Sequence, residues 1–336
     1  MDKDSVNEII ACLPQGKTRF DYFKDRYALI LLYHLLEQEI KVADLKRSAY
    51  ARLLERPVVK KTLATASTGW LNRYLFNMVW DKPTYTFLLT LSTWGGYQRT
   101  WQQTSRPGYN LVLQLNFSNQ HEQPYRQLLK PTTESMFKCN GHPIMKRGQR
   151  DFFRETLAWA RIDLDFKDDE ALIEEIQSDW IRESQEKLRE VLTDNDNEPI
   201  EIFIDGMEGD SQHLKKYFNE ILKPYTQLWD EAMLTATLHF ICDELGIHNI
   251  FYHSYETGCA IKKCQPPRSL YTQLPQQFCF HPTLEAPQFL QRITKFRQAM
   301  KKIDHPFWYK LDLTKKELYH ANQKNPKPAR SIAYLA

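Results

Sequence analysis

The chain has 336 residues, of which 42% are hydrophobic, 13% aromatic and 26% charged. This composition is typical of a globular protein with a sizeable core, and it excludes a wholly disordered chain. With 45 Lys and Arg against 42 Asp and Glu, the formal net charge of +3 is too small for a surface that is basic throughout, as a general nucleic-acid coat requires.

Two features of the sequence bear on location. The six cysteines are scattered, and the opening residues MDKDSVNEII lack the basic-then-apolar order of a signal peptide. We therefore expect a reducing, cytoplasmic location. The longest apolar run, residues 28–36, is far shorter than the roughly 20 residues of a bilayer span, so we expect no transmembrane helix and no membrane partner.

The first part of the chain, residues 1–82, has a helical pattern. Over residues 18–66, apolar side chains recur at three- and four-residue spacing, which predicts two or three helices. Cations interleave with this pattern: Lys41, Lys46, Arg47, Arg52, Arg56, Lys60 and Lys61. A nucleic-acid contact through these basic helices is one hypothesis, and a solvated helical face is the alternative.

Strand patterns begin after Pro83. The alternating segments TYTFLLTLSTW and NLVLQLNFS, with the turn-forming SRPGYN between them, predict antiparallel sheet. Residues 122–150 are expected to form loop with a short helix at 125–129. A charged amphipathic helix is expected after Trp180, followed by an acidic, solvated insertion at 193–210 with a short strand at 200–204.

The segments TLAWARIDLDF (156–166) and ALIEEIQSDW (171–180) predict a hairpin that turns at Asp168-Asp169 and pairs Phe166 with Ala171. Because side chains alternate along a strand, this register puts Glu175 opposite Ile162 and Gln177 opposite Ala160.

In that register, three polar side chains, Glu175, Gln177 and Asp179, project inward into a core or cleft. A buried carboxylate without partners is costly, so it requires a proton, a cation or a function. A slipped register or a wet edge is the alternative. On the other face, Arg161 and Glu174 are expected to form a structural ion pair.

Residues 225–245 have a broad apolar stripe and end at Gly246, which predicts a helix, and the strand IHNIFYHSY follows. In such a strand–helix–strand unit, sites gather at strand ends and helix starts. The next stretch carries candidate phosphate or cofactor contacts, although it has no glycine-rich fingerprint. These candidates are Thr257, Gly258, Lys262, Arg268 and Ser269.

The same region contains histidines and cysteines, the residue types that bind zinc. His253, Cys259, Cys264, Cys279 and His281 lack the paired spacing that is usual at both ends of a tetrahedral site. We therefore predict no metal site there and expect ordinary core cysteines.

The hairpin, the Trp-bearing helix that follows and GIHNIFYHSYETG together resemble the EIQSDW domain of large polyvalent proteins from phages and other mobile elements. The likeness covers about residues 155–260, and the hexapeptide 175–180 is complete. Two positions depart from the family pattern: Ile181 replaces a His, and Ala158-Trp159 replace Ala-His. The resemblance implies a phage or mobile-element context and no particular reaction.

The order hairpin, helix, strand, short helix and closing strand is also similar to the GNAT acyltransferase fold, and SLYTQLPQQFCF is similar to that superfamily's lYeklGF phrase. This resemblance implies acyl-CoA as a cofactor, with Glu175 or Asp179 as general base and Tyr271 near the leaving thiolate. It makes Lys262 and Arg268 the phosphate contacts. The glycine-rich turn that normally holds the pyrophosphate at a helix start is missing.

Two other functions stay open. Asp163 with Glu175-Ile176-Gln177 has the composition of a metal-dependent nuclease, but the predicted register puts Asp163 and Glu175 on opposite faces. Alternatively, the polar cluster only stabilises the sheet, with Asp179 capping the next helix and Trp180 in the core. The protein then binds a partner through its N-terminal helices.

We expect an α+β protein with a mixed, mainly antiparallel sheet flanked by helices and a GNAT-like core. The predicted regions are a helical N-terminal region (1–82), an α+β core (83–285) and a C-terminal helix with a tail (286–336). Catalytic roles are assigned to Glu175, Gln177, Asp179 and Tyr271. The first three are expected to share a hollow with Thr257 and Gly258.

Overall fold

The computed structural model describes most of the chain. The described residues are 1–12, 18–36, 39–65, 69–96, 103–132, 136–139, 141–143, 155–193, 206–208, 210–262 and 265–313. The predicted strand at 200–204, most of the acidic insertion and the predicted tail lie outside these residues.

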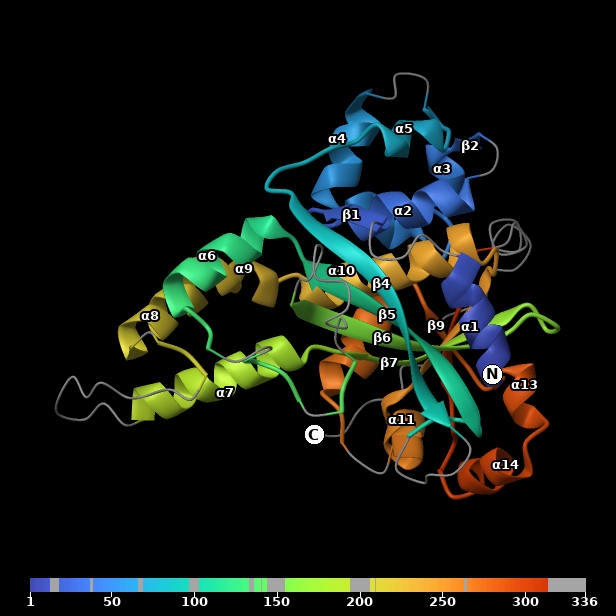
Figure 1. The fold of residues 1–336 in the computed structure, drawn as a ribbon. Coiled ribbons are helices and arrows are strands. Elements are labelled where there is room, and N and C mark those ends of the chain that lie inside the picture. Colours follow the sequence, from blue (N-terminus) through green and yellow to red (C-terminus); the bar gives the residue numbers. More distant parts are fainter. Residues whose placement is uncertain are drawn as a thin grey trace.

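One eight-stranded sheet organises the fold, in the order β1-β4-β5-β6-β7-β8-β10-β9 (Figure 1). All neighbouring strands are antiparallel except β7 and β8, which are parallel. The sheet therefore confirms an α+β fold with a mainly antiparallel sheet. Its strands are β1 (Thr18–Tyr22), β4 (Tyr85–Gly96), β5 (Gly108–Phe117), β6 (Thr156–Asp165), β7 (Glu170–Gln177), β8 (Asn249–His253), β9 (His281–Thr283) and β10 (Trp308–Asp312). A separate two-stranded sheet joins β2 (Ile40–Lys41) and β3 (Trp70–Leu71).

Helices surround the sheet. Helices α2 to α5 gather at the top of Figure 1, α1 lies at the right beside the N-terminus, α6 to α8 extend to the left, and α11, α13 and α14 lie below the sheet. The α-helices are α1 (Lys3–Cys12), α2 (Arg26–Leu35), α3 (Val42–Leu45), α4 (Pro57–Thr65), α5 (Tyr74–Asn77), α6 (Asn119–Leu129), α7 (Asp179–Thr193), α8 (Ser211–Lys216), α9 (Lys223–Thr226), α10 (Trp229–His239), α11 (Tyr255–Lys262), α12 (Gln273–Gln277), α13 (Gln288–Gln291) and α14 (Thr294–Met300). Wider π-helical turns follow α8 and α10, at Tyr217–Leu222 and Phe240–Glu244. Tighter 3-10 turns occupy Ala51–Glu55 and Arg268–Tyr271. In the part of the chain that is described, no helix has the length and apolar character to cross a bilayer.

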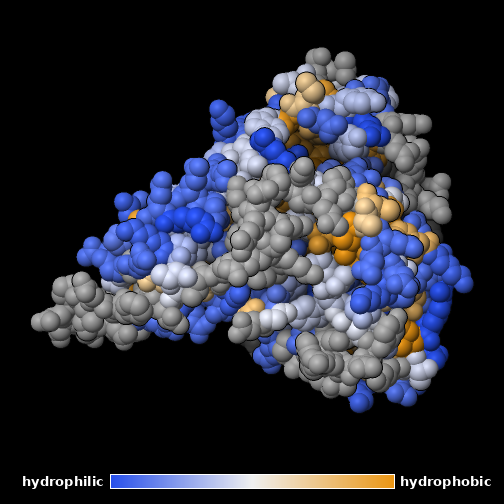
Figure 2. Space-filling model, in the orientation of Figure 1, coloured by the Kyte–Doolittle hydropathy of each residue, from blue (hydrophilic) through white to orange (hydrophobic). Residues whose placement is uncertain are grey.

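A hydrophobic cluster covers each face of the sheet, so the central strands are buried on both sides. Helix α10 packs against β6 and β7 on one face, where Ala160, Ile162 and Ile173 join the main core. Leu172 and Phe251 point to the other face and pack with the C-terminal helices. On the outside, the face seen in Figure 2 is mainly hydrophilic over α6 and α8 and shows hydrophobic colour around the N-terminal helices.

All three predicted regions contribute strands to the large sheet. Residues Thr18–Tyr22 were expected to be helical, but they form the edge strand β1 and pair with β4. The C-terminal region also supplies a strand, β10, which inserts between β8 and β9. The expected C-terminal helix is two short helices, α13 and α14, with Phe289 and Phe296 buried.

The predicted β6–β7 register is wrong. The turn spans four residues, 166–169, because the Asp165 carboxylate accepts hydrogen bonds from the backbone N–H groups of Lys167 (3.2 Å) and Asp168 (3.3 Å) and ends the strand early. Leu164 therefore pairs with Ala171, and Phe166, which was expected inside, is 55% exposed.

A bulge then changes the register within the hairpin. Ile162 pairs with Ile173, whereas the preceding Arg161 pairs with Glu175, so Glu174 is the extra residue on β7. Gln177 lies opposite Trp159. Glu175 and Gln177 consequently face Arg161 and Trp159, not the apolar Ile162 and Ala160 that were predicted.

Candidate functional site

A cavity of about 730 Å³ opens where β7 ends and α7 begins. Residues 175–178 of the EIQSDW run form one wall, continued by Ile181, Arg182 and Gln185 of α7. The start of α10, at Trp229 and Asp230, and the segment 265–270 form other parts of the lining. Trp94, Trp159 and His142 complete an aromatic side. The cavity thus joins apolar rings with several polar side chains, a combination typical of ligand sites.

The parallel strands β7 and β8 separate at this cavity. They pair only from Glu170 with Asn249 to Ile173 with Tyr252, and β7 continues to Gln177 beyond the last pair. Consecutive side chains of a strand point to opposite faces, yet Glu175, Ile176 and Gln177 all line the cavity. The cavity therefore meets β7 along the edge that has parted from β8.

Glu175 is a buried, ion-paired residue. Its Oε2 lies 2.5 Å from Nη2 of Arg161, whose side chain is fully buried and lies over the Trp94 ring, 5.3 Å from the ring centre. Arg161 was predicted to pair with Glu174; its 2.5 Å ion pair is with Glu175, and its charge also helps to lower the pKa of Glu174. The polar run in β7 is therefore not a solvated edge, since its first cavity residue has a buried cation opposite.

Glu174 belongs to a separate buried network. Its carboxylate accepts hydrogen bonds from the backbone N–H (2.9 Å) and the hydroxyl (2.7 Å) of Ser105, and it lies 3.1 Å from Nε2 of His253. Burial acts to raise the pKa of Glu174, but the hydrogen bond and charge of His253 outweigh it and lower the pKa to about 2. None of the three residues lines the cavity, so this network stabilises the sheet.

The predicted corner at Thr257 and Gly258 is not part of the cavity lining. Both residues lie in α11, where the fully buried Thr257 is 3.1 Å from Nδ1 of His253. A Cβ on Gly258 would come within 3.1 Å of Cε1 of Tyr271, so glycine allows the helix to approach this ring. The hollow predicted to join these two residues to Glu175 and Gln177 is therefore wrong in that part.

The other predicted cofactor residues are dispersed. Ser269 lines the cavity. Arg268 is exposed and its guanidinium lies 4.9 Å from the centre of the Tyr255 ring, while Lys262 is the last residue of α11. Among the members of this set whose side chains the structure describes, Ser269 is the one on the cavity wall.

Asp179 is saturated with hydrogen-bond donors. Gln177 (2.6 Å) and Arg182 (2.8 Å) donate to its Oδ1, while Trp159 (3.1 Å) donates to Oδ2. Nδ1 of His142 lies 2.8 Å from the same Oδ2. Burial acts to raise the pKa of Asp179, but these donors and the positive charge of Arg182 lower it overall.

The predicted capping role of Asp179 is wrong, because Ser178 has it. The Ser178 hydroxyl accepts from the backbone N–H of Ile181 (3.1 Å) and donates to the Leu157 carbonyl (2.5 Å). The expectation that Trp180 lies in the core is confirmed, since it is 1% exposed. Its indole N–H donates to the Tyr217 hydroxyl at 2.8 Å.

His142 is the residue of this site that the sequence did not reveal. Its ring packs edge-on against Trp94 and Trp159, whose indoles stack with centres 6.1 Å apart. An anionic Asp179 beside Nδ1 favours the tautomer with the proton on Nδ1, which leaves Nε2 as a base when the ring is neutral. No spacing pattern signals His142, because it lies in irregular chain before Pro143.

Two buried tyrosines, Tyr252 and Tyr271, are not among the residues that line the cavity. Burial, together with the nearby Glu175 charge, raises the pKa of Tyr271 well above its usual value, so its phenol stays protonated. Burial and Glu175 also raise the pKa of Tyr252. Among the described residues, the Tyr252 hydroxyl has no hydrogen-bond partner. Both phenols therefore remain neutral hydrogen-bonding groups.

The predicted register put Asp163 and Glu175 on opposite faces of the hairpin, and this prediction is wrong. Asp163 is two residues from Arg161 on β6 and thus shares the face of the Arg161–Glu175 pair. Its carboxylate accepts two hydrogen bonds from Arg106, from Nε at 2.7 Å and from Nη2 at 2.9 Å. A carboxylate occupied by a guanidinium is a poor ligand for a nuclease metal ion.

Several of the basic N-terminal side chains have acidic neighbours. Arg47 pairs with Asp44, Lys60 with Glu55 (2.7 Å) and Lys61 with Asp81 (3.1 Å). These ion pairs reduce the net positive charge of the N-terminal helices, and with it their attraction to nucleic acid.

Comparison with known proteins gives no relative: no family model, no curated protein and no solved structure matches the chain.

Proposed function

We propose that the cavity is the active site of an acyltransferase with a GNAT-like core, which moves an acyl group from a thioester to an acceptor nucleophile. One observation carries the proposal: the parallel pair β7 and β8 separates after Ile173, and the cavity lies along the freed part of β7. The pantetheine arm of an acyl thioester is a narrow chain with amide groups. Such a chain fits beside a strand edge, where backbone groups can bind its amides.

His142 is the proposed general base. Its position against two indoles and beside Asp179 is that of a base oriented by a carboxylate, the arrangement that activates nucleophiles in many hydrolases and transferases. We assign to it the removal of a proton from the acceptor amine or hydroxyl. Asp179 is the positioning residue, because its two oxygens are already occupied by donors.

Tyr271 is the proposed hydrogen-bond donor to the leaving group. The acceptor forms a bond to the acyl carbon, the carbon–sulfur bond breaks, and the thiolate takes the proton that His142 removed from the acceptor, so that the base is restored. Tyr271 directly follows Ser269 and Leu270, which line the cavity. A phenol that burial keeps protonated can donate a hydrogen bond to the departing sulfur.

The start of α7 sets a condition on the donor. Asp179 places a carboxylate beside the first backbone N–H groups of the helix, and the Ser178 hydroxyl already accepts from one of them. This arrangement repels a diphosphate from the helix start, which is where a GNAT would hold it. We therefore assign donor recognition to the acyl-pantetheine part.

The resemblance to the EIQSDW domain supports the same region, since residues 155–260 supply β6, β7, α7 and β8. On that resemblance we also propose a phage or mobile-element context and a cytoplasmic protein.

The experiment is a thiol-release assay with a primary amine acceptor, using acetyl-CoA and acetyl-pantetheine as alternative donors. We expect turnover with both donors and comparable KM values, because the diphosphate adds little binding. His142→Gln should lower kcat by about 10²–10⁴-fold. Glu186→Gln, on the exposed side of α7, is the matched control and should leave kcat unchanged.

Ligand-linked stabilisation provides an independent measurement, since a bound donor raises the melting temperature. The absence of both thiol release and a thermal shift with either donor would refute the transferase proposal.

A further inference from the structure

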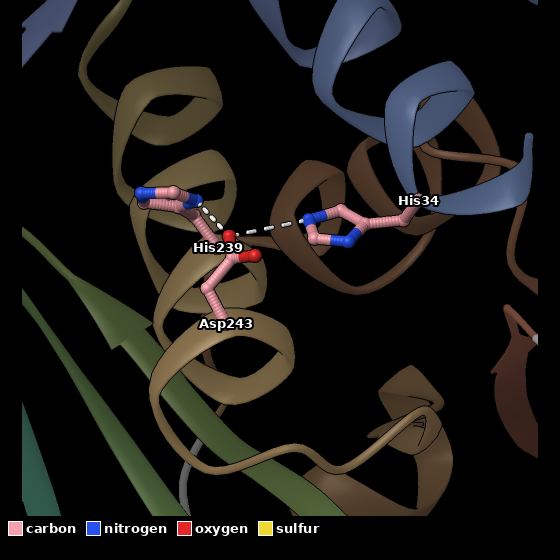
Figure 3. Close-up of side chains that lie close together, drawn as sticks. All are labelled: His34, His239 and Asp243. Carbon is pink, nitrogen blue, oxygen red and sulfur yellow. Dashed lines mark ion pairs between the residues drawn. The ribbon is translucent and has the colours of Figure 1, made fainter. Parts of the chain in front are cut away.

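A second group of chemically active side chains lies away from the cavity, between α2 and the end of α10. His34 comes from α2, His239 is the last residue of α10, and Asp243 lies in the π-helical turn that follows. Figure 3 shows both imidazole rings directed at the carboxylate of Asp243. One ligand atom from each of the three residues lies within 4.8 Å of the other two.

The distances already approach those of a metal site. Nε2 of His34 lies 3.4 Å from Oδ2 of Asp243, and Nδ1 of His239 contacts the same oxygen. With zinc bonds of about 2.0–2.1 Å, ligand atoms of a tetrahedral site are roughly 3.4 Å apart. A small rotation of the His239 side chain, which is 44% exposed, would separate it from the carboxylate and open the space for an ion.

Two further observations point to a ligand at this position. Nε2 of His34 is buried, its side chain being only 7% exposed, and its 3.4 Å ion pair with Oδ2 of Asp243 is too long for a well-formed hydrogen bond. A metal ion between the two groups would satisfy this buried nitrogen more fully. The three residues also border a cavity of about 190 Å³, which extends past Tyr33 and Asn77.

We propose that His34, His239 and Asp243 form a binding site for a divalent transition-metal ion, with Zn²⁺ as the best match. Two imidazoles and one carboxylate suit zinc and similar ions, whereas Mg²⁺ and Ca²⁺ prefer oxygen ligands alone. The carboxylate of Asp243 gives the site a negative charge that attracts a cation.

The three protein ligands leave a fourth position of a tetrahedral zinc ion unfilled. The neighbouring cavity gives that position room for water or a small anion. The ion also links two distant parts of the chain, because His34 and Asp243 are joined only through the fold. Metal binding is therefore expected to stabilise the contact of α2 with α10, which pack together.

Two of the three proposed ligands are close together in the sequence. His239 and Asp243 are four residues apart, so they lie on one side of a helix. The π-helical turn Phe240–Glu244 keeps them together while it widens the helix, and such turns are frequent at functional sites. His34 has no sequence relationship to them.

The test is equilibrium dialysis of the purified chain against Zn²⁺, followed by metal analysis, with Co²⁺ as a spectroscopic substitute. We expect retention of one zinc per chain at this site and a visible Co²⁺ spectrum of low coordination number. His239→Asn and Asp243→Asn keep polar side chains of similar size at partly exposed positions. Each should weaken Zn²⁺ binding by more than about 100-fold, since even supporting residues around metal ligands contribute 10–100-fold.

His305→Asn is the control, because His305 is 91% exposed and outside the site. It should bind Zn²⁺ as the wild type does. Zn²⁺ should also raise the melting temperature of the wild type and not that of His239→Asn. Failure of the wild type to retain zinc, or equal zinc binding by His239→Asn, overturns the assignment.

Discussion

Arg161 and Glu175 face each other across β6 and β7, with Nη2 2.5 Å from Oε2, and Glu175 lines the larger of the two cavities described. The arginine side chain is fully buried and that of the glutamate is 11% exposed. A bulge allows this strand to accommodate its polar run, because it turns Glu175 towards a buried cation. Because Arg161 is its partner, the negative charge of Glu175 on the cavity wall is balanced by a buried positive charge.

Removing only one partner of this pair should be strongly destabilising. Glu175→Ala leaves the Arg161 charge buried without its partner, and we expect a loss of about 3–5 kcal/mol in the free energy of unfolding. The double variant Arg161→Met with Glu175→Leu removes both charges and should recover most of that loss. Urea denaturation measures both effects. Glu55→Ala, which breaks an exposed pair with Lys60, is the control and should leave stability unchanged.

Asp179 should affect catalysis through His142. Asp179→Asn keeps the size of the side chain and removes the charge that orients the imidazole, so we expect thiol release to fall by about 10²-fold or more. If the two residues act as one unit, adding His142→Gln to Asp179→Asn should cause little further loss. Initial rates and their pH profile measure this, and an Asn variant with the wild-type rate would exclude the pair from catalysis.

Glu170 should make stability depend on pH. Burial raises its pKa to about 7 from 4.5, against the opposing effect of the hydrogen bond that its Oε2 accepts from the Gln288 backbone N–H at 2.7 Å. Because the folded-state pKa is above the unfolded value, the contribution of Glu170 is complete below pH 4.5 and is lost as the pH rises through 7. We expect a loss on the order of 2 kcal/mol once solvent screening is allowed for.

Glu170→Gln isolates this effect. The amide stays neutral at every pH and its oxygen can still accept from Gln288, so the difference in stability between pH 5 and pH 8 should shrink by that amount. Chemical denaturation at the two pH values measures it. An unchanged difference in the Gln variant would assign the pH dependence to other groups.

Gly258 should resist replacement by alanine, although alanine usually stabilises a helix by up to about 1 kcal/mol. The new Cβ would lie 3.1 Å from Cε1 of the buried Tyr271 ring, and we expect a loss of about 1–3 kcal/mol from overpacking. In a Tyr271→Leu background the ring is absent, so Gly258→Ala should be neutral or favourable. Thermal and urea unfolding of the four chains decide between these outcomes.

Local sequence patterns determined the fold class and many of the elements. Alternating residues and turn chemistry predicted β4, β5, β6 and β7, and the apolar stripe at 225–245 predicted the helical segment that contains α10. The density of charge in residues 174–179 correctly marked a region with unusual polar contacts. These patterns are readable because they depend on backbone periods and on neighbours a few residues apart.

The tertiary structure alone decided what those polar residues meet. A turn two residues longer than predicted and one bulge redirected Glu175 from Ile162 to Arg161, because a shift of one residue exchanges the two faces of a strand. His142 reaches Asp179, and His34 reaches Asp243, only through packing between distant segments. No local period encodes such contacts, since they depend on where whole elements settle when the core is buried.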